Sequence, residues 1–180
     1  MNVDREIIYA SQIGSLDRVR AKLDKGTDPN IQDRNGFTAL WMACNGEYLD
    51  VVKELLSRGA NPNITDYEGV SPLYLATFNN YPEIIKELLL YGADPNIMSD
   101  DRVTPLYWAT FYNHSELIKE LLLYGADPSI VPDDNLQGRN REVIEILKNY
   151  FHTLRMISTR CIRKQIIDIS KIPDVVLQSS

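Results

Sequence analysis

The 180-residue chain has few of the residues that build disulfide frameworks and zinc sites. It holds two cysteines and two histidines, and Cys44 and Cys161 lie far apart without any CxxC spacing. A small secreted scaffold needs more paired cysteines, and a structural zinc site needs four closely spaced ligands. The composition therefore favours a protein of a reducing compartment with neither kind of site.

Long apolar runs are also missing. No run approaches the roughly 20 residues of a transmembrane helix, and the N-terminal residues MNVDREIIYA are charged where a signal peptide has an apolar core. With 44% hydrophobic and 24% charged residues, the composition is that of a soluble globular protein. We expect one folded domain with a short appendage, in the cytoplasm and also in the nucleus, with no membrane association.

Basic residues are scarce in the first three quarters of the chain. Residues 1–138 hold 11 Lys and Arg against 21 Asp and Glu, whereas residues 139–180 hold 8 against 4. The acidic first segment offers no basic patch for nucleic acid, so we predict no nucleic-acid partner. The reversal of charge indicates a change of segment near residue 138.

Catalytic motifs are absent as well. The sequence has no GxSxG, P-loop or HExxH pattern and no nucleophile with a neighbouring base. The carboxylates of Asp100, Asp101, Asp133 and Asp134 fall in expected loops, but they lack the DxDxDG spacing of a calcium site. We interpret them as a solvated edge. The sequence predicts no enzyme, no bound metal and no cofactor.

What the sequence does contain is a repeat of 33 residues that never changes phase. The equivalent positions are Gly26, Gly59, Gly92 and Gly125; Asn30, Asn63, Asn96 and Ser129; Leu40, Leu73 and Leu106; and Ala43, Ala76 and Ala109. Such regularity indicates a stack of similar units.

Each unit is predicted to contain two helices. The first begins after a hydroxyl N-cap, and the N-caps are Thr38, Ser71 and Thr104. The second is exemplified by PEIIKELLLYG, where an apolar stripe ends at Gly92, a residue suited to a left-handed C-terminal cap. One unit cannot bury both helices alone, so we predict an all-α solenoid in which neighbouring units supply the core.

The segments DRNGFTALWMACNGEYLDVVKELLSRGANPN, DYEGVSPLYLATFNNYPEIIKELLLYGADPN and DDRVTPLYWATFYNHSELIKELLLYGADPS closely resemble ankyrin repeats. The resemblance implies helix-turn-helix units joined by hairpin loops. It divides residues 1–150 into an N-terminal capping repeat (1–30), three full repeats (31–63, 64–96 and 97–129) and a shortened repeat (130–150), followed by a helical tail (151–180).

Two departures from the ankyrin pattern carry expectations. The position after the T-P-L triplet is commonly a histidine that ties neighbouring loops together, but here it is Trp41, Tyr74 or Tyr107. We expect aromatic packing to replace that hydrogen bonding. Arg102 stands where the third loop should have glycine, and a positive φ would strain it. We therefore expect the third loop to bend differently.

In ankyrin-repeat proteins the concave face, made by loop tips and first helices, is the usual partner surface. The resemblance thus implies a monomeric protein-binding module. The aligned positions are Arg34, Asn35, Phe37, Asn45, Tyr67, Glu68, Val70, Phe78, Asn79, Asp100, Asp101, Val103, Phe111 and Tyr112. Exposed aromatic rings and carboxylates in this set predict a partner with apolar and basic groups. The alternative is that the rings only pack on one another along the stack.

The tail suggests a second role. TLRMISTRCI resembles the elongin-binding part of a SOCS box, which implies that Leu154, Ser158, Ile162 and Ile166 form a helical stripe on elongin B/C. KIPDVVLQSS resembles the cullin-selecting part more weakly. The implied function is the substrate-recognition adaptor of an elongin/cullin ubiquitin ligase. The alternative is a stand-alone ankyrin scaffold or inhibitor whose tail only caps the repeat stack.

Overall fold

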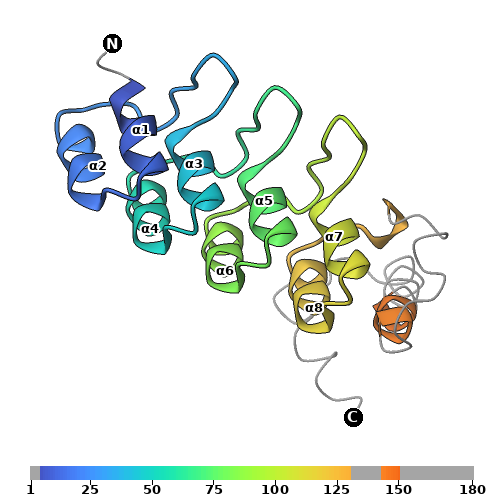
Figure 1. The fold of residues 1–180 in the computed structure, drawn as a ribbon. Coiled ribbons are helices and arrows are strands. Elements are labelled where there is room, and N and C mark those ends of the chain that lie inside the picture. Colours follow the sequence, from blue (N-terminus) through green and yellow to red (C-terminus); the bar gives the residue numbers. More distant parts are fainter. Residues whose placement is uncertain (1–4, 131–142, 151–180) are drawn as a thin grey trace, which may run out of the picture.

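The helices follow one another as stacked pairs (Figure 1). The computed structural model describes residues 5–130 and 143–150. The pairs are α1 (Glu6–Gln12) and α2 (Leu16–Leu23), α3 (Ala39–Asn45) and α4 (Leu49–Ser57), α5 (Pro72–Phe78) and α6 (Pro82–Leu90), and α7 (Pro105–Phe111) and α8 (Ser115–Leu123). A short 3-10 helix, η2 (Pro128–Ile130), and a helix over residues 143–150 follow. The prediction of an all-α solenoid is confirmed.

The pairs form two layers. The odd-numbered helices α1, α3, α5 and α7 contact one another in order, and α2, α4 and α6 do the same in the second layer. Long loops precede α3, α5 and α7 and project beyond the layer of odd-numbered helices (Figure 1). This layer and the loops therefore make one continuous face, which we call the inner face. The even-numbered helices make the outer layer.

Small side chains allow the inner helices to pack closely. Ala43, Ala76 and Ala109 are fully buried at equivalent positions of α3, α5 and α7. The outer helices add larger aliphatic side chains to the same core, and the fully buried ones include Leu55, Ile84, Ile85, Leu88, Ile118 and Leu121. Cys44 is also fully buried, and this burial raises the pKa of its thiol, which makes it unreactive.

Hydroxyl side chains cap the N-termini of α3, α5 and α7 as predicted. The bonds run from Trp41 N to Thr38 Oγ1 at 3.1 Å, from Tyr74 N to Ser71 Oγ at 3.1 Å, and from Tyr107 N to Thr104 Oγ1 at 3.3 Å. All three hydroxyl residues are buried, so the caps satisfy backbone N–H groups that water could not reach.

Asparagine side chains join each repeat to the next through the same two hydrogen bonds. Asn63 Nδ2 donates to Gly92 O at 3.0 Å, and Asn63 Oδ1 accepts from Asp94 N at 2.7 Å. Asn30 and Asn96 repeat this pattern one unit before and one unit after. The glycine carbonyl lies just past the end of an outer helix, where a carbonyl lacks a helical partner. Each bridge therefore closes one repeat with a side chain of its predecessor.

The loops also stack directly on one another. Tyr67 N donates to Asn35 O at 3.3 Å, and Asp100 N donates to Glu68 O at 2.9 Å. Gly36 has φ 84°, and a Cβ added there would lie 2.8 Å from Tyr67 N. Glycine is thus required at this position both by its left-handed backbone and by the approach of the next loop.

The third loop does not bend differently, so this expectation is wrong. Arg102 adopts φ 60°, in the same left-handed region as Gly36 at 84° and Gly69 at 74°. Arg102 N donates to Ser99 O at 2.8 Å, and Ser99 N donates to Val103 O at 3.0 Å. The equivalent two hydrogen bonds close the first and second loops as well. The loop keeps its turn, and the arginine takes up the unfavourable conformation instead.

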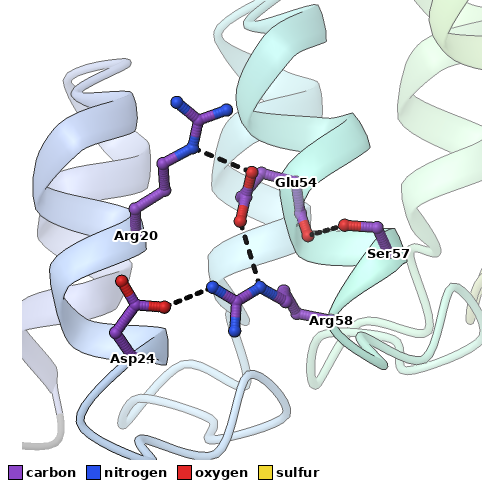
Figure 2. Close-up of polar contacts among 5 residues, drawn as sticks. All are labelled: Arg20, Asp24, Glu54, Ser57 and Arg58. Carbon is purple, nitrogen blue, oxygen red and sulfur yellow. Dashed lines mark hydrogen bonds and ion pairs between the residues drawn. The ribbon is translucent and has the colours of Figure 1, made fainter.

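Ion pairs link the outer helices at the N-terminal end of the stack (Figure 2). Arg20 of α2 donates to Glu54 of α4 at 2.9 Å, and Arg58 reaches both Glu54, at 3.1 Å, and Asp24. The hydrogen bond and charge of Arg20, with those of Arg58, hold the pKa of the Glu54 carboxyl below its usual range. Surface pairs of this kind contribute little stability each.

The asparagine bridges can be tested by Asn63→Ala. We expect the free energy of unfolding to fall by about 1–3 kcal/mol, because the N–H of Asp94 and the carbonyl of Gly92 lose their partner. Chemical denaturation followed by circular dichroism measures the change. Asn45→Ala, at the exposed end of α3, is the control and should stay within about 0.5 kcal/mol of the parent. Equal losses in both variants would contradict the bridging role.

The strain at Arg102 predicts a stabilising substitution. Arg102→Gly should raise the free energy of unfolding by about 0.5–1 kcal/mol, because relief of a left-handed residue outweighs the added freedom of glycine in the unfolded chain. Thermal and denaturant unfolding both report it. Arg102→Ala removes the charge but keeps the Cβ, so it should bring no gain. A gain of the same size in the alanine variant would assign the effect to charge and not to the backbone.

Candidate protein-binding surface

A groove of about 510 Å³ lies on the inner face between the first two loops, α3 and α5. Its lining residues are Arg34, Asn35, Phe37, Trp41, Asp66, Tyr67, Glu68, Val70, Tyr74, Leu75 and Phe78. The structure thus brings together the sequence-predicted residues of the first two loops with Phe78. Asn45, which is exposed, and Asn79, which is half-buried, lie at the ends of α3 and α5 and do not line it.

Trp41 both packs and donates a hydrogen bond. Its ring stacks on Phe37 with centroids 4.1 Å apart, and its Nε1 donates to Val70 O of the next loop at 3.2 Å. The expectation that aromatic packing replaces hydrogen bonding between loops is therefore wrong at this position. Trp41 keeps the link to the neighbouring loop because its indole carries an N–H at the edge of a large ring.

The second loop presents its side chains from a fixed backbone. Asp66 is buried, and its Oδ1 accepts from the backbone N–H groups of Glu68 and Val70, both at 2.9 Å. Tyr67 and Glu68 are exposed between these anchored points, and the Tyr67 side chain is 68% exposed. Asp66 is a structural carboxylate, whereas Glu68 is exposed and contributes to the lining of the groove.

A second aromatic cluster is centred on Trp108 of α7. The ring of Trp108 lies 4.8 Å from Phe78, 5.2 Å from Tyr107, 5.7 Å from Phe111, 5.8 Å from Tyr112 and 6.1 Å from Tyr74, between centroids. This cluster joins α5 to α7. Phe78, Phe111 and Tyr112 nevertheless remain 42%, 39% and 41% exposed. These three rings therefore pack along the stack and still present apolar area to solvent.

Sequence reasoning missed several members of the two aromatic groups. The sequence pattern assigns Trp41 and Tyr74 to packing between loops, and it singles out neither Trp108 nor the aliphatic Leu75, which also lines the groove. The period of 33 residues places Trp108 and Leu75 at one equivalent position of the inner helices. Because equivalent positions of the inner helices share one face, this register could have indicated that Leu75 and Trp108 lie on it.

The third loop adds exposed charge. Asp100 and Asp101 are exposed, as is Arg102, while Val103 is half-buried. Across residues 31–37, 64–70 and 97–103, the loops hold Asp33, Asp66, Glu68, Asp100 and Asp101 against Arg34 and Arg102. The loop edge of the inner face is acidic. The tail positions Leu154, Ser158, Ile162 and Ile166, and the loop residues Asp133 and Asp134, lie outside the described residues.

Other candidate chemistry is limited in the part of the chain that the structure describes. His114 lies at the start of α8, with its ring 5.9 Å from that of Tyr112. Within residues 5–130 and 143–150, no three His, Cys, Asp or Glu side chains gather as a metal site would require. No helix among these residues is long and apolar enough to span a membrane.

Family models match the repeated region. A model described as ankyrin repeats in three copies matches residues 7–99, and a model of a single ankyrin repeat matches residues 101–133. Comparison with curated proteins gives no significant match. The two family matches meet within the third loop, close to Arg102, and include both aromatic groups of the inner face.

Proposed function

This chain belongs to the ankyrin-repeat family and is a protein–protein interaction module, and we propose that it holds its partner on the inner face. Ankyrin-repeat proteins are typically interaction scaffolds without catalytic activity. The proposal therefore concerns which surface binds the partner and what the partner must offer.

The observation that carries the proposal is the band of partly exposed aromatic rings along the inner face. Tyr67 borders the groove, Phe78 adjoins both the groove and the Trp108 cluster, and Phe111 and Tyr112 extend the band over α7. Rings that are already held by packing lose little freedom on binding, and their remaining apolar area is desolvated by a partner. Such residues are typical hot spots.

The proposed contact residues are the aligned positions of the concave face without Asn45 and Val103, with two additions from the ring contacts. They are Arg34, Asn35, Phe37, Tyr67, Glu68, Val70, Phe78, Asn79, Asp100, Asp101, Phe111 and Tyr112, with Trp41 and Trp108. The acidic loop edge favours a partner segment that carries basic as well as apolar groups. We propose residues 1–150 as the ankyrin-repeat domain that presents this surface.

The proposed surface predicts a difference between inner and outer variants. Phe78→Ala with Phe111→Ala should reduce the amount of partner captured from cell extract at least tenfold, because each truncated hot spot costs about 1–2 kcal/mol of binding. The matched control is Leu90→Ser with Leu123→Ser, at outer-layer side chains that are 69% and 60% exposed. Quantitative mass spectrometry compares each bound protein, and circular dichroism confirms folding. Loss of the bound protein in the outer variant alone would overturn the proposal.

The second candidate role is that of an elongin/cullin adaptor. Its support is the order of Leu154, Ser158, Ile162 and Ile166 directly after the repeats. A second support is that the helix over residues 143–150 already joins the core: Val143 and Leu147 are buried, and Tyr150 donates to Leu122 O of α8 at 3.2 Å. A stack that has this helix at its end has less need of a tail as a cap.

The adaptor role predicts co-elution of the full chain with purified elongin B/C in size-exclusion chromatography. Leu154→Asp should abolish the complex, because a carboxylate would be buried in an apolar groove. Arg160→Ala, off the predicted stripe, should leave it unchanged. Absence of any complex would contradict the adaptor role and leave the inner-face proposal standing, with the tail as the alternative cap.

A further inference from the structure

The groove between the first two full repeats combines aromatic walls with an exposed carboxylate residue in its lining. Phe37, Trp41 and Tyr67 contribute rings from two neighbouring repeats, and Glu68 contributes an exposed carboxylate beside Tyr67. The volume of about 510 Å³ falls within the roughly 300–1,000 Å³ of sites that enclose small ligands. The groove is therefore large enough to take up a long side chain of a partner.

The walls of the groove are held in place before any partner arrives. Trp41 is fixed through its backbone N–H, which donates to Thr38, and through its indole N–H, which donates to Val70. Tyr67 N donates to Asn35 O, so the ring of Tyr67 projects from a loop that is bonded to its neighbour. The Trp41 wall and the loop backbones are thus arranged before binding, which lowers the entropy cost of forming the site.

The charge around the groove selects among possible side chains. The faces of aromatic rings carry negative electrostatic potential and attract cations, most strongly for Trp and Tyr. The lining carries Asp66 and Glu68 against Arg34, and the three loops together are acidic. An acidic side chain is repelled here, and a neutral apolar one uses the rings but not the carboxylate. A lysine or arginine uses both.

We propose that this groove is the specificity pocket for one lysine or arginine side chain of the partner, with its cation over the rings of Trp41 and Tyr67 and close to Glu68. This inference rests on the proposed function, because the partner must first approach the inner face. It places the partner's basic group at the first two full repeats, residues 31–63 and 64–96. The Trp108 cluster, lined by rings, takes the apolar residues of the same segment.

Selection from a random peptide library against the full chain tests the inference without knowledge of the partner. We expect the enriched peptides to share a lysine or arginine. Synthetic versions in which norleucine replaces that residue should bind at least tenfold more weakly by isothermal titration calorimetry, since norleucine keeps the chain length and loses the charge. Binding of the parent peptide should also weaken as salt is added.

Variants locate the basic residue. Glu68→Gln should weaken binding of the basic peptide at least threefold and leave binding of its norleucine version unchanged. Glu83→Gln, at an exposed residue of α6, should change the binding of neither peptide. The indole N–H signal of Trp41, identified in NMR spectra by its loss in Trp41→Phe, should shift on binding. An equal effect of Glu68→Gln on both peptides would overturn the proposed charge recognition.

Failure of the inference is distinguishable from failure of the proposed function. Enriched peptides that lack a basic residue, yet lose binding with Phe78→Ala and Phe111→Ala, would overturn the cation pocket and support the inner face as the binding surface. No enrichment, or binding insensitive to every inner-face variant, would contradict both.

Discussion

The dependence of each repeat on its neighbour is the constraint from which the other features follow. No pair of helices encloses its own apolar side chains, so burial is achieved only by stacking. Buried alanines at Ala43, Ala76 and Ala109 allow the inner helices to approach, and side chains such as Asn63 bond across each junction. Because the junctions are alike, the loops arrive at the same spacing, and their backbones bond to one another. The result is one continuous inner face built from segments that are distant in sequence.

The groove belongs to a junction and not to any single repeat. Phe37 and Trp41 come from one unit, while Asp66, Tyr67 and Val70 come from the next. Trp41 connects the two parts with its bond to Val70, so the same side chain stabilises the stack and forms a wall of the candidate site. Stability and recognition are therefore coupled at this residue, and substitutions there act on both. Glu68, which extends into solvent, is free of this coupling, which makes it suited to probing recognition alone.

The repeats share one backbone conformation and differ in the side chains that they expose. The third loop has Ser99 and Arg102 where the second has Asp66 and Gly69, yet it keeps the same closing hydrogen bonds. The stack determines that conformation strongly enough to hold a non-glycine residue at positive φ. The exposed side chains can therefore differ from repeat to repeat while the backbone stays the same. The junction between the first two full repeats carries a groove with Glu68 in its lining, and the next junction carries the rings around Trp108.

The sequence alone determined the period, the helix pairs, their hydroxyl caps and the all-α solenoid, because these depend on local chemistry repeated every 33 residues. The resemblance to ankyrin repeats also placed Phe37, Tyr67 and Phe78 on the inner face, which is the proposed binding surface. The sequence could not place Trp108 at the centre of a cluster, nor foresee that Trp41 bonds to Val70, because those contacts join residues of different repeats or rings of different helices. The expectation for the third loop was wrong for the same reason. Local preference predicts strain at Arg102, but only the surrounding hydrogen bonds determine that the loop keeps its turn and that Arg102 adopts a positive φ.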